Sequence, residues 1–400
     1  MGEYEEERGQ PPYDPTMMTA LLLYAYTQGV YSSRRIARGC EERVDFMAVT
    51  ALQRPDFRTV NDFRKRHLKT LGGLFVQVLR LCGEAGLVKL GHVALDGSKI
   101  RANASKHKGM SYRRMKKEEE RLRAQVRRWF ELAEAADAEE DEEYGADRRG
   151  DELPDWVADK QKRLEKIREA KEALERKARE RDAEAVERRK GKAEKGERSR
   201  GRPPKRELGK PEDKEQRNFT DPDSRIMKTA DGFQQCYNAQ AAVDASSQVI
   251  VGQALTDSAT DRRQLIPLVD AVREGTGKDP KEVSADCDYC SEANLEALEA
   301  RGIRGYVATG KQQHGQPDPV EDRKTTPGTR THAMKIRIRR GGYRSRYRLR
   351  KQTVEPVFGQ IKAARGFRQF LLRGIDKVSQ EWALLCTAHN LAKLMAVARA

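Results

Sequence analysis

Apolar residues recur at helical spacing in the first quarter of the chain, where they predict a small all-α domain over residues 1–90. The segment DPTMMTALLLYAYTQGV has Asp14 in the position of an N-cap and Pro15 at the first helical position, followed by an apolar face. Further helices follow, and we expect Thr59 or Asn61 to cap the one that leads into a longer helix. Basic residues gather in the turns, which leaves two interpretations: a helical bundle with a solvated face, or a helix-turn-helix-like domain that binds DNA.

Residues 91–112 and 218–400 have a different pattern, in which strand-like runs alternate with helical ones. HVALD in the first range is a short apolar run that ends in an acid and is followed by Gly. The second range predicts two antiparallel strands and then a helix, a strand, a helix, a strand and a long helix, with the strands over 235–256, 282–286 and 304–308 and the last helix from about Lys351. This is the element order of the RNase H-like α/β fold, a mixed sheet with flanking helices.

The segment between these ranges, residues 113–217, is of another kind, with 33 Lys and Arg against 30 Asp and Glu. Its oppositely charged pairs at helical spacing predict a long exposed helix or a helical hairpin, and the stretch KGKAEKGERSRGRPPKREL is expected to be disordered. A scaffolding role would need apolar heptads, and the candidates are too sparse to make them: Leu164, Ile167, Leu174 and Val186. We interpret the segment as a charged insertion into the domain formed by residues 91–112 and 218–400, without a core of its own.

Charge is spread unevenly along the chain, whose formal net charge is +16. Residues 323–373 hold 16 Lys and Arg but a single acid, Glu355, and therefore carry nearly all of the excess. Such a tract attracts a polyanion, usually nucleic acid, and Tyr347 within it can hydrogen-bond a phosphate or stack on an exposed base. A solvated basic loop without a partner is the alternative, at the cost of self-repulsion. The pattern favours contact with DNA.

Two features bear on where the protein acts. The N-terminus, MGEYEEERGQPPYDP, lacks the basic start and apolar run of a signal peptide, and the longest apolar stretch is far too short to span a bilayer. The cysteines are scattered, and the pair Cys287 and Cys290 has no second pair to complete a zinc site. We expect a cytoplasmic, nucleoid-associated protein with reduced cysteines and no membrane partner.

Three carboxylates fall where the predicted fold places functional groups. Asp96 ends the first strand, Asp286 ends the strand after the first crossover helix, and Glu355 lies in the first turns of the last helix. Strand ends of such a sheet face one cleft, and phosphoryl transfer with two metal ions needs several converging carboxylates. Each acid also has an ordinary interpretation, as a turn residue or as a partner in a surface ion pair. Asp288, two residues after Asp286, would face the same side of a strand and is an alternative metal ligand.

Several segments together resemble the DDE-type transposases of bacterial insertion sequences: LDGSKIRANASKHKGMSYRRM, YNAQAAVD, ADCDY and VEPVFGQIKAARGFRQFLLRG. The branch they resemble most is the one grouped with the insertion sequence numbered eleven-eighty-two, near the number-five group. PDFRTVNDFRKRH is similar to the N-terminal domain of that family. The resemblance covers most of the chain outside 113–217, and its motifs are specific in combination.

The resemblance implies the identity of the metal ligands. The three acids of the family fall on Asp96, Asp286 and Glu355, which would hold two Mg²⁺ or Mn²⁺ ions. The second motif of the family is Ala-Asp followed by a small residue, Gly and Tyr, and this chain has Asp288 where Gly is usual. That departure bears on the local metal geometry, and Asp286 remains the expected ligand.

The resemblance also implies DNA contacts around the third acid. The signature Tyr-x2-Arg-x3-Glu-x6-Lys is kept in part: Tyr347 and Arg350 have the first spacing, but Lys351 stands where the Arg is expected. Lys362 follows Glu355 by seven residues, two helical turns on the same face. The implied DNA contacts are therefore Tyr347, Arg350 or Lys351, and Lys362.

A transposase of this family would cleave DNA strands at the ends of its element and transfer them to a target. Its partners would be double-stranded DNA, namely the terminal repeats and the target, and we expect a homodimer because two ends must be held together. Two rivals remain: a catalytically inactive, transposase-derived DNA-binding protein, and a nuclease of the same fold that acts on RNA–DNA hybrids. The basic tract and the N-terminal helices favour duplex DNA ends over hybrids.

Overall fold

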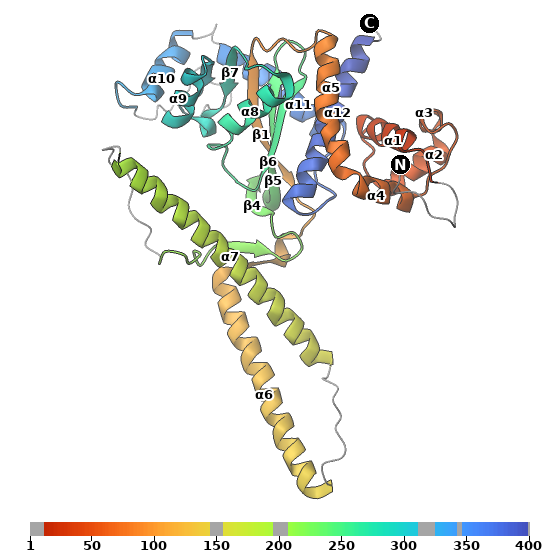
Figure 1. The fold of residues 1–400 in the computed structure, drawn as a ribbon, viewed down its shortest axis with the longest axis vertical. Coiled ribbons are helices and arrows are strands. Elements are labelled where there is room, and N and C mark those ends of the chain that lie inside the picture. Colours follow the sequence, from red (N-terminus) through yellow and green to blue (C-terminus); the bar gives the residue numbers. More distant parts are fainter. Residues whose placement is uncertain (1–11, 145–154, 195–206, 311–324, 342–345, 399–400) are drawn as a thin grey trace. The chain divides into compact units, whose positions relative to one another are not determined.

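The structure is a computed structural model that describes residues 12–144, 155–194, 207–310, 325–341 and 346–398 (Figure 1). The acidic start of the chain and most of the stretch expected to be disordered lie outside the described residues. The chain divides into two units, one formed by 1–103 together with 226–400 and the other by 104–225. The domain boundaries drawn from the sequence remain a prediction. Within the described ranges, no helix is long and apolar enough to cross a membrane.

Five helices open the first unit: α1 (Pro15–Thr27), α2 (Ser33–Glu42), α3 (Val44–Val49), α4 (Phe57–Arg66) and α5 (Leu68–Glu84). The predicted start of α1 is confirmed, because Asp14 accepts the amide hydrogen of Thr16 at 2.6 Å and a proline follows the cap. The predicted cap of α4 is wrong. Asp56 caps it by accepting the amide hydrogen of Thr59 at 2.7 Å, so Thr59 donates to the cap and Asn61 lies inside the helix.

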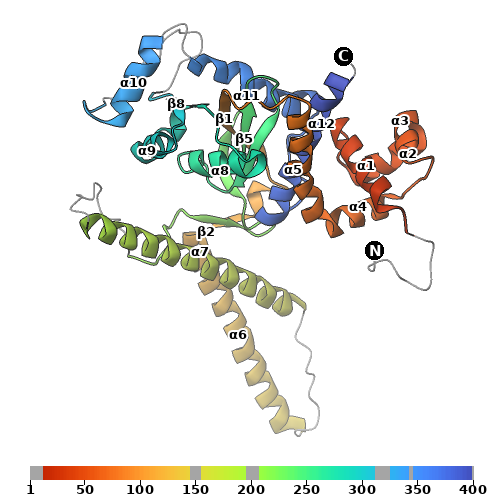
Figure 2. The same cartoon turned by 45° about the horizontal axis from the view of Figure 1, so that its top comes forward.

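The N-terminal helices share a core with the C-terminal helix. α5 lies beside α12 (Ile375–Ala398) in both Figure 1 and Figure 2. Gly72 makes this approach possible, because an added Cβ there would meet the side-chain oxygen of Gln380 at 2.0 Å. The helices therefore pack directly against the rest of the first unit.

The sheet of the first unit is built around β1 (Val93–Arg101). β5 (Gly232–Asp244) pairs antiparallel with the whole of β1. β6 (Ile250–Thr256) pairs antiparallel with β5. On the other side, β7 (Glu282–Ala285) and then β8 (Arg304–Val307) run parallel to β1. The order is β4-β5-β1-β7-β8, with β4 (Arg225–Thr229) and β6 both pairing with β5. This mixed sheet confirms the predicted RNase H-like fold.

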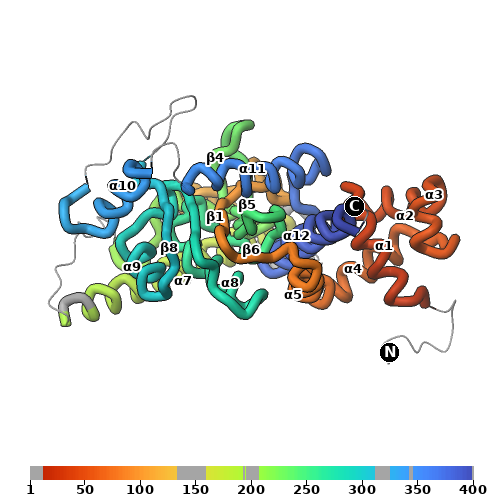
Figure 3. Tube along the Cα trace, turned by 90° about the horizontal axis from the view of Figure 1, so that it is seen from above, coloured from red at the N-terminus to blue at the C-terminus, as the bar shows by residue number. Residues whose placement is uncertain are grey.

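Helices cover both faces of the sheet, with α8 and α11 on opposite sides of β1 and β5 in Figure 3. α8 (Leu265–Thr276) covers one face with the fully buried Leu268 and Val272. On the other face, α11 (Leu349–Gly359) and α12 pack together, and the buried Trp382 donates its indole N–H to the carbonyl oxygen of Gln240 at 3.1 Å. α9 (Glu292–Ala300) and α10 (Arg330–Gly341) flank β8.

Two details of the predicted element order are corrected. Asp96 does not end β1, because the strand continues to Arg101, whereas the parallel pairing with β7 ends at Ala94. The last helix is not one long element either: α11 continues into a π-helix over Gln360–Ala364, and α12 begins after a separate irregular segment.

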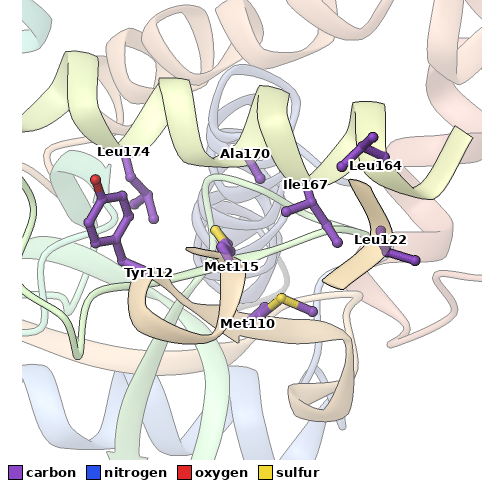
Figure 4. Packing of buried hydrophobic residues seen from close by; sticks show 8 residues of the cluster. All are labelled: Met110, Tyr112, Met115, Leu122, Leu164, Ile167, Ala170 and Leu174. Carbon is purple, nitrogen blue, oxygen red and sulfur yellow. The ribbon is translucent and has the colours of Figure 1, made fainter. Parts of the chain in front are cut away.

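The second unit consists of a pair of long helices and a short two-stranded sheet. α6 (Tyr112–Tyr144) packs against α7 (Asp155–Glu194), and β2 (Gly109–Ser111) pairs antiparallel with β3 (Gln216–Asn218). The predicted helical pair is present, but the expectation that the insertion has no core is wrong. Figure 4 shows its buried cluster: Met110, Tyr112, Met115, Leu122, Leu164, Ile167, Ala170 and Leu174. The cluster was missed because Met and Ala complete an apolar face on which the large aliphatic residues are sparse.

We predict that Ile167→Ala destabilises the second unit by roughly 2–4 kcal/mol, because Ile167 is 1% exposed and its removal leaves a cavity. Hydrogen exchange should accelerate at the amides of α7 while those of β1 and β5 keep their protection. Leu132→Ala is the matched control, since Leu132 is 61% exposed on α6. Unchanged exchange in the Ile167 variant would show that the cluster does not hold the helices together.

A buried acid on α12 holds the segment that precedes this helix and lies near a buried arginine of the N-terminal helices. Glu381 on α12 is 1% exposed and accepts the backbone amide hydrogens of Leu371 and Leu372 at 3.1 Å each. Burial raises the pKa of Glu381 to about 7, although these two hydrogen bonds and the nearby charge of Arg64 act in the opposite direction. Arg64 is itself buried and donates to the carbonyl oxygen of Tyr31 at 2.8 Å.

We predict a pH-dependent loss of stability from this acid. The folded-state pKa of Glu381 lies above its ordinary value of 4.5. The contribution of protonated Glu381 to the free energy of unfolding is therefore complete below pH 4.5 and is lost as the pH rises through about 7. The loss amounts to roughly 3 kcal/mol. Glu381→Gln should therefore reduce the fall in the free energy of unfolding between pH 5 and pH 8, measured in urea. The exposed Glu84→Gln serves as control, and an unchanged pH dependence in the Glu381 variant would refute the assignment.

Candidate active site

Asp96 and Asp286 lie at the same edge of the sheet, because the strands that carry them run parallel. Asp96 follows the part of β1 that pairs with β7, and Asp286 is the first residue after β7. Asp286 caps a short 3-10 helix, Cys287–Tyr289, by accepting the amide hydrogen of Asp288 at 2.9 Å. The expectation that Asp286 and Asp288 share one side of a strand is therefore wrong, since neither lies in a strand. Asp286 is half-buried, whereas Asp288 is exposed.

Arg350 connects the first and third predicted acids. Its guanidinium forms ion pairs with Asp96, from Nη1 to Oδ2 at 2.8 Å, and with Glu355, from Nη2 to Oε1 at 3.5 Å. Tyr347 is hydrogen-bonded to the same guanidinium. The side chain of Arg350 is 10% exposed, while that of Glu355 is 51% exposed at the rim. Lys351, the other candidate for the family's Arg, is exposed.

Burial and like charge raise the pKa of both aspartates. For Asp96 burial is the largest cause, Arg350 and the Gly97 amide oppose it, and the charges of Asp286 and Asp261 add to it, so that its pKa reaches about 7. Burial is also the main cause that raises the pKa of Asp286. A nearby cation favours the charged form of such carboxylates. A positive charge at this edge of the sheet would therefore stabilise the ionised form of both carboxylates.

The donor set fits a divalent cation that prefers oxygen ligands. Mg²⁺ uses one or two protein carboxylates and keeps several waters, and Mn²⁺ accepts the same kind of ligand. Asp96 and Asp286 supply such a pair, and the guanidinium of Arg350 supplies positive charge between Asp96 and Glu355. In the described part of the chain, no three His, Cys, Asp or Glu side chains converge closely enough to hold one ion. Glu355 is joined to Asp96 through Arg350.

Lys362 is anchored to the strand that carries the first acid. Its Nζ donates to Ser98 Oγ at 2.6 Å and to the carbonyl oxygen of Lys99 at 2.9 Å. Burial lowers the pKa of Lys362. The expected two α-helical turns between Glu355 and Lys362 are not kept, because the π-helix changes the period after Gly359.

The basic tract is partly neutralised by acids from elsewhere in the sequence. Arg330 forms ion pairs with Glu296 at 3.3 Å and Glu299 at 2.9 Å, and Arg346 pairs with Glu282 at 3.1 Å. Glu355 is thus the single acid in the sequence of the tract, but other acids lie close to the tract in space. Part of the positive charge counted from the sequence is used to attach α10 and the segment before α11 to the sheet domain.

A buried polar network lies on the α8 side of the sheet, and sequence reasoning missed it. Asp261 Oδ1 accepts hydrogen bonds from Asn238 Nδ2 and Gln240 Nε2, each at 2.6 Å, and Gln240 Oε1 accepts one from the hydroxyl of Tyr289. Gly97, next to Asp96, faces this network across β1 and β5. The signal was present in YNAQAAV, where two amides recur at i and i+2 in an otherwise apolar strand.

We predict that Gly97→Ala disrupts this edge of the sheet. An added Cβ would lie 2.2 Å from Gln240 Nε2 and 2.7 Å from Asp261 Oδ1, and neither atom can move without breaking the network. The expected cost is about 1–3 kcal/mol in the free energy of unfolding. Gly73→Ala is the control, because its Cβ would meet nothing within 4 Å on an exposed helix face. Equal stability of the two variants would contradict the packing described.

Comparison with known protein families identifies two transposase domains in the chain. A family described as Transposase DDE domain matches residues 208–391, and one described as Transposase domain (DUF772) matches residues 1–66. No curated protein and no solved structure matches the chain. The two family matches together span more than half of the sequence. They include β4 to β8, the helix with Glu355 and helices α1 to α4, whereas α5 and β1 with Asp96 lie outside both. The chain therefore belongs to the DDE transposases of insertion sequences.

Proposed function

We propose that the protein cleaves DNA strands at the ends of its element and transfers the freed 3′ ends to target DNA, with Asp96, Asp286 and Glu355 as catalytic acids. The observation that carries the proposal is the meeting of Asp96 and Asp286 at one edge of an RNase H-like sheet, with Glu355 linked to Asp96 through Arg350. Both reactions are phosphoryl transfers, so one site can serve them in turn. We further propose that the protein belongs to the branch of insertion-sequence transposases numbered eleven-eighty-two.

Asp96, Asp286 and Glu355 are proposed to hold two Mg²⁺ or Mn²⁺ ions. When bound, such ions supply Lewis-acid activation of the attacking oxygen and offset charge on the leaving oxygen. The half-buried position of the two aspartates strengthens their electrostatic interaction with a bound cation. Arg350 positions the carboxylates of Asp96 and Glu355 relative to each other by forming an ion pair with each.

The remaining family positions are proposed to contact DNA. Tyr347 and Arg350 lie next to each other at the acids, and Lys351 is exposed on the same helix. Lys362 holds β1 near Asp96 and contributes positive charge to the same region. The partners are double-stranded terminal repeats and target DNA, the acting form is a homodimer on two ends, and the site of action is the nucleoid in the cytoplasm.

We predict that Asp96→Asn, Asp286→Asn and Glu355→Gln each reduce metal-dependent strand cleavage by at least about a hundredfold, because each removes an anionic ligand of the metal ions that would offset charge on the reacting phosphate. The measurement uses a labelled duplex that carries the terminal repeat of the element, with Mg²⁺ or Mn²⁺. Binding of the duplex should be retained in all three variants, since each replacement is nearly isosteric.

Asp288→Asn is the matched comparison, because Asp288 is exposed two residues from Asp286. We expect it to retain cleavage. Cleavage that survives Asp286→Asn but not Asp288→Asn would move the second acid to Asp288. A protein that binds the repeat but never cleaves it would instead be the inactive DNA-binding derivative.

A further inference from the structure

The network around Asp261 is buried and geometrically complete. The exposed fraction is 7% for Asp261, 1% for Asn238 and 0% for both Gln240 and Tyr289. Asn238 Nδ2 also donates to the carbonyl oxygen of Ser258 at 3.1 Å, and Gln240 Nε2 donates to Asn238 Oδ1 at 3.0 Å. These contacts join β5, the segment before α8 and the turn after β7.

Asp261 sets the direction of the hydrogen bonds that lead from it to Tyr289. An ionised carboxylate can only accept, so both side-chain amides turn their NH₂ groups towards Asp261. The oxygen of Gln240 is then left to accept the hydroxyl hydrogen of Tyr289. A neutral amide in place of Asp261 could present either a donor or an acceptor, and this single orientation would no longer be enforced.

Tyr289 belongs to the turn that carries Asp286. It is the last residue of the 3-10 helix that Asp286 caps. A second tie reinforces the first: Asn294 Nδ2 donates both to the carbonyl oxygen of Tyr289 at 2.7 Å and to that of Arg262 at 2.8 Å, next to Asp261. The turn is therefore attached to the segment around Asp261 both through a side chain of β5 and through α9.

The placement of Asp261 has an electrostatic cost, which the hydrogen bonds from Asn238 and Gln240 partly offset. Its charge lies near those of Asp96 and Asp286, and burying like charges close together is unfavourable. The network packs directly against β1 beside Asp96, because an added Cβ at Gly97 would lie 2.7 Å from Asp261 Oδ1. A charged residue at this position is consistent with a need for one fixed arrangement of the turn beside β1.

We propose that Asp261 is a positioning residue for the metal site: through Gln240 and Tyr289 it fixes the turn that holds Asp286 beside Asp96. The inference rests on the proposed function, because it assumes that these two aspartates bind the metal. Asp261 acts through its neighbours and is not itself proposed as a ligand.

The test measures Mn²⁺ binding to the DNA-free protein by electron paramagnetic resonance, together with the Mg²⁺ dependence of strand cleavage. Asp261→Asn and Tyr289→Phe should each weaken Mn²⁺ binding on the order of tenfold, as loss of an outer-shell partner does. Half-maximal cleavage should need more Mg²⁺ by a similar factor, and the rate at saturating Mg²⁺ should largely recover. The double variant should lose no more than the worse single one, because both changes break the same chain of contacts.

Asp270→Asn is the control, because it removes a carboxylate from α8 that pairs with Arg301 on the surface. It should leave Mn²⁺ affinity unchanged. Wild-type affinity and Mg²⁺ dependence in both Asp261→Asn and Tyr289→Phe would overturn the proposal. If Asp261→Asn does not fold, Tyr289→Phe decides alone, since it removes one hydroxyl and keeps the buried ring.

Asp96→Asn separates this inference from the proposed function. Loss of Mn²⁺ binding in Asp96→Asn, with wild-type binding in Asp261→Asn and Tyr289→Phe, rejects the role of Asp261 alone. Undiminished Mn²⁺ binding in Asp96→Asn rejects the metal site itself, and the inference about Asp261 with it.

Discussion

The burial of two neighbouring carboxylates, Asp96 and Asp286, is the constraint around which this site is arranged. Parallel pairing of β1 and β7 brings both acids to one edge of the sheet, where burial and mutual charge oppose their ionisation. Arg350 on α11 supplies positive charge there: its guanidinium forms ion pairs with Asp96 and with Glu355. On the opposite face, the network around Asp261 holds the turn after β7 in place. The cost of assembling these charges is offset by packing on both faces of the sheet.

The element order of the domain could be predicted from the sequence because each strand and helix carries its own local pattern. Apolar runs and cap residues such as Asp14 depend on neighbours a few positions away, and the structure bears them out. The catalytic role of the three acids remains a proposal. The cap of α4 was missed because Asp56, Thr59 and Asn61 are all acceptable cap residues by type, and only the backbone geometry selects Asp56.

The contacts that define the site depend on residues far apart in the sequence. Arg350 meets Asp96 across 254 positions, and no periodicity along the chain encodes such a pair. The π-helix after Gly359 breaks the spacing on which the predicted face of Lys362 rested. The core of the second unit was missed for a related reason: Met115 and Ala170 are weak signals singly, and become a core when α6 lies against α7.

The two family matches describe regions that the structure does not keep apart. The match over residues 1–66 ends with α4, yet α5 follows it directly and packs along α12, most of which lies in the region of the other match. Buried Arg64 and Glu381 lie near each other across this boundary. The N-terminal helices are therefore built into the same unit as the sheet, so DNA contacts made by the helices would be held at a fixed position relative to the acids.

The central claim is that Asp96 and Asp286 form one metal site. Anomalous diffraction from crystals of the protein soaked in Mn²⁺ tests it most directly, because it locates the ion without reference to activity. The account predicts an anomalous peak in contact with both carboxylates, at the edge of the sheet where Arg350 now pairs with Asp96. A peak elsewhere, or one that contacts Asp288 and not Asp286, would contradict it.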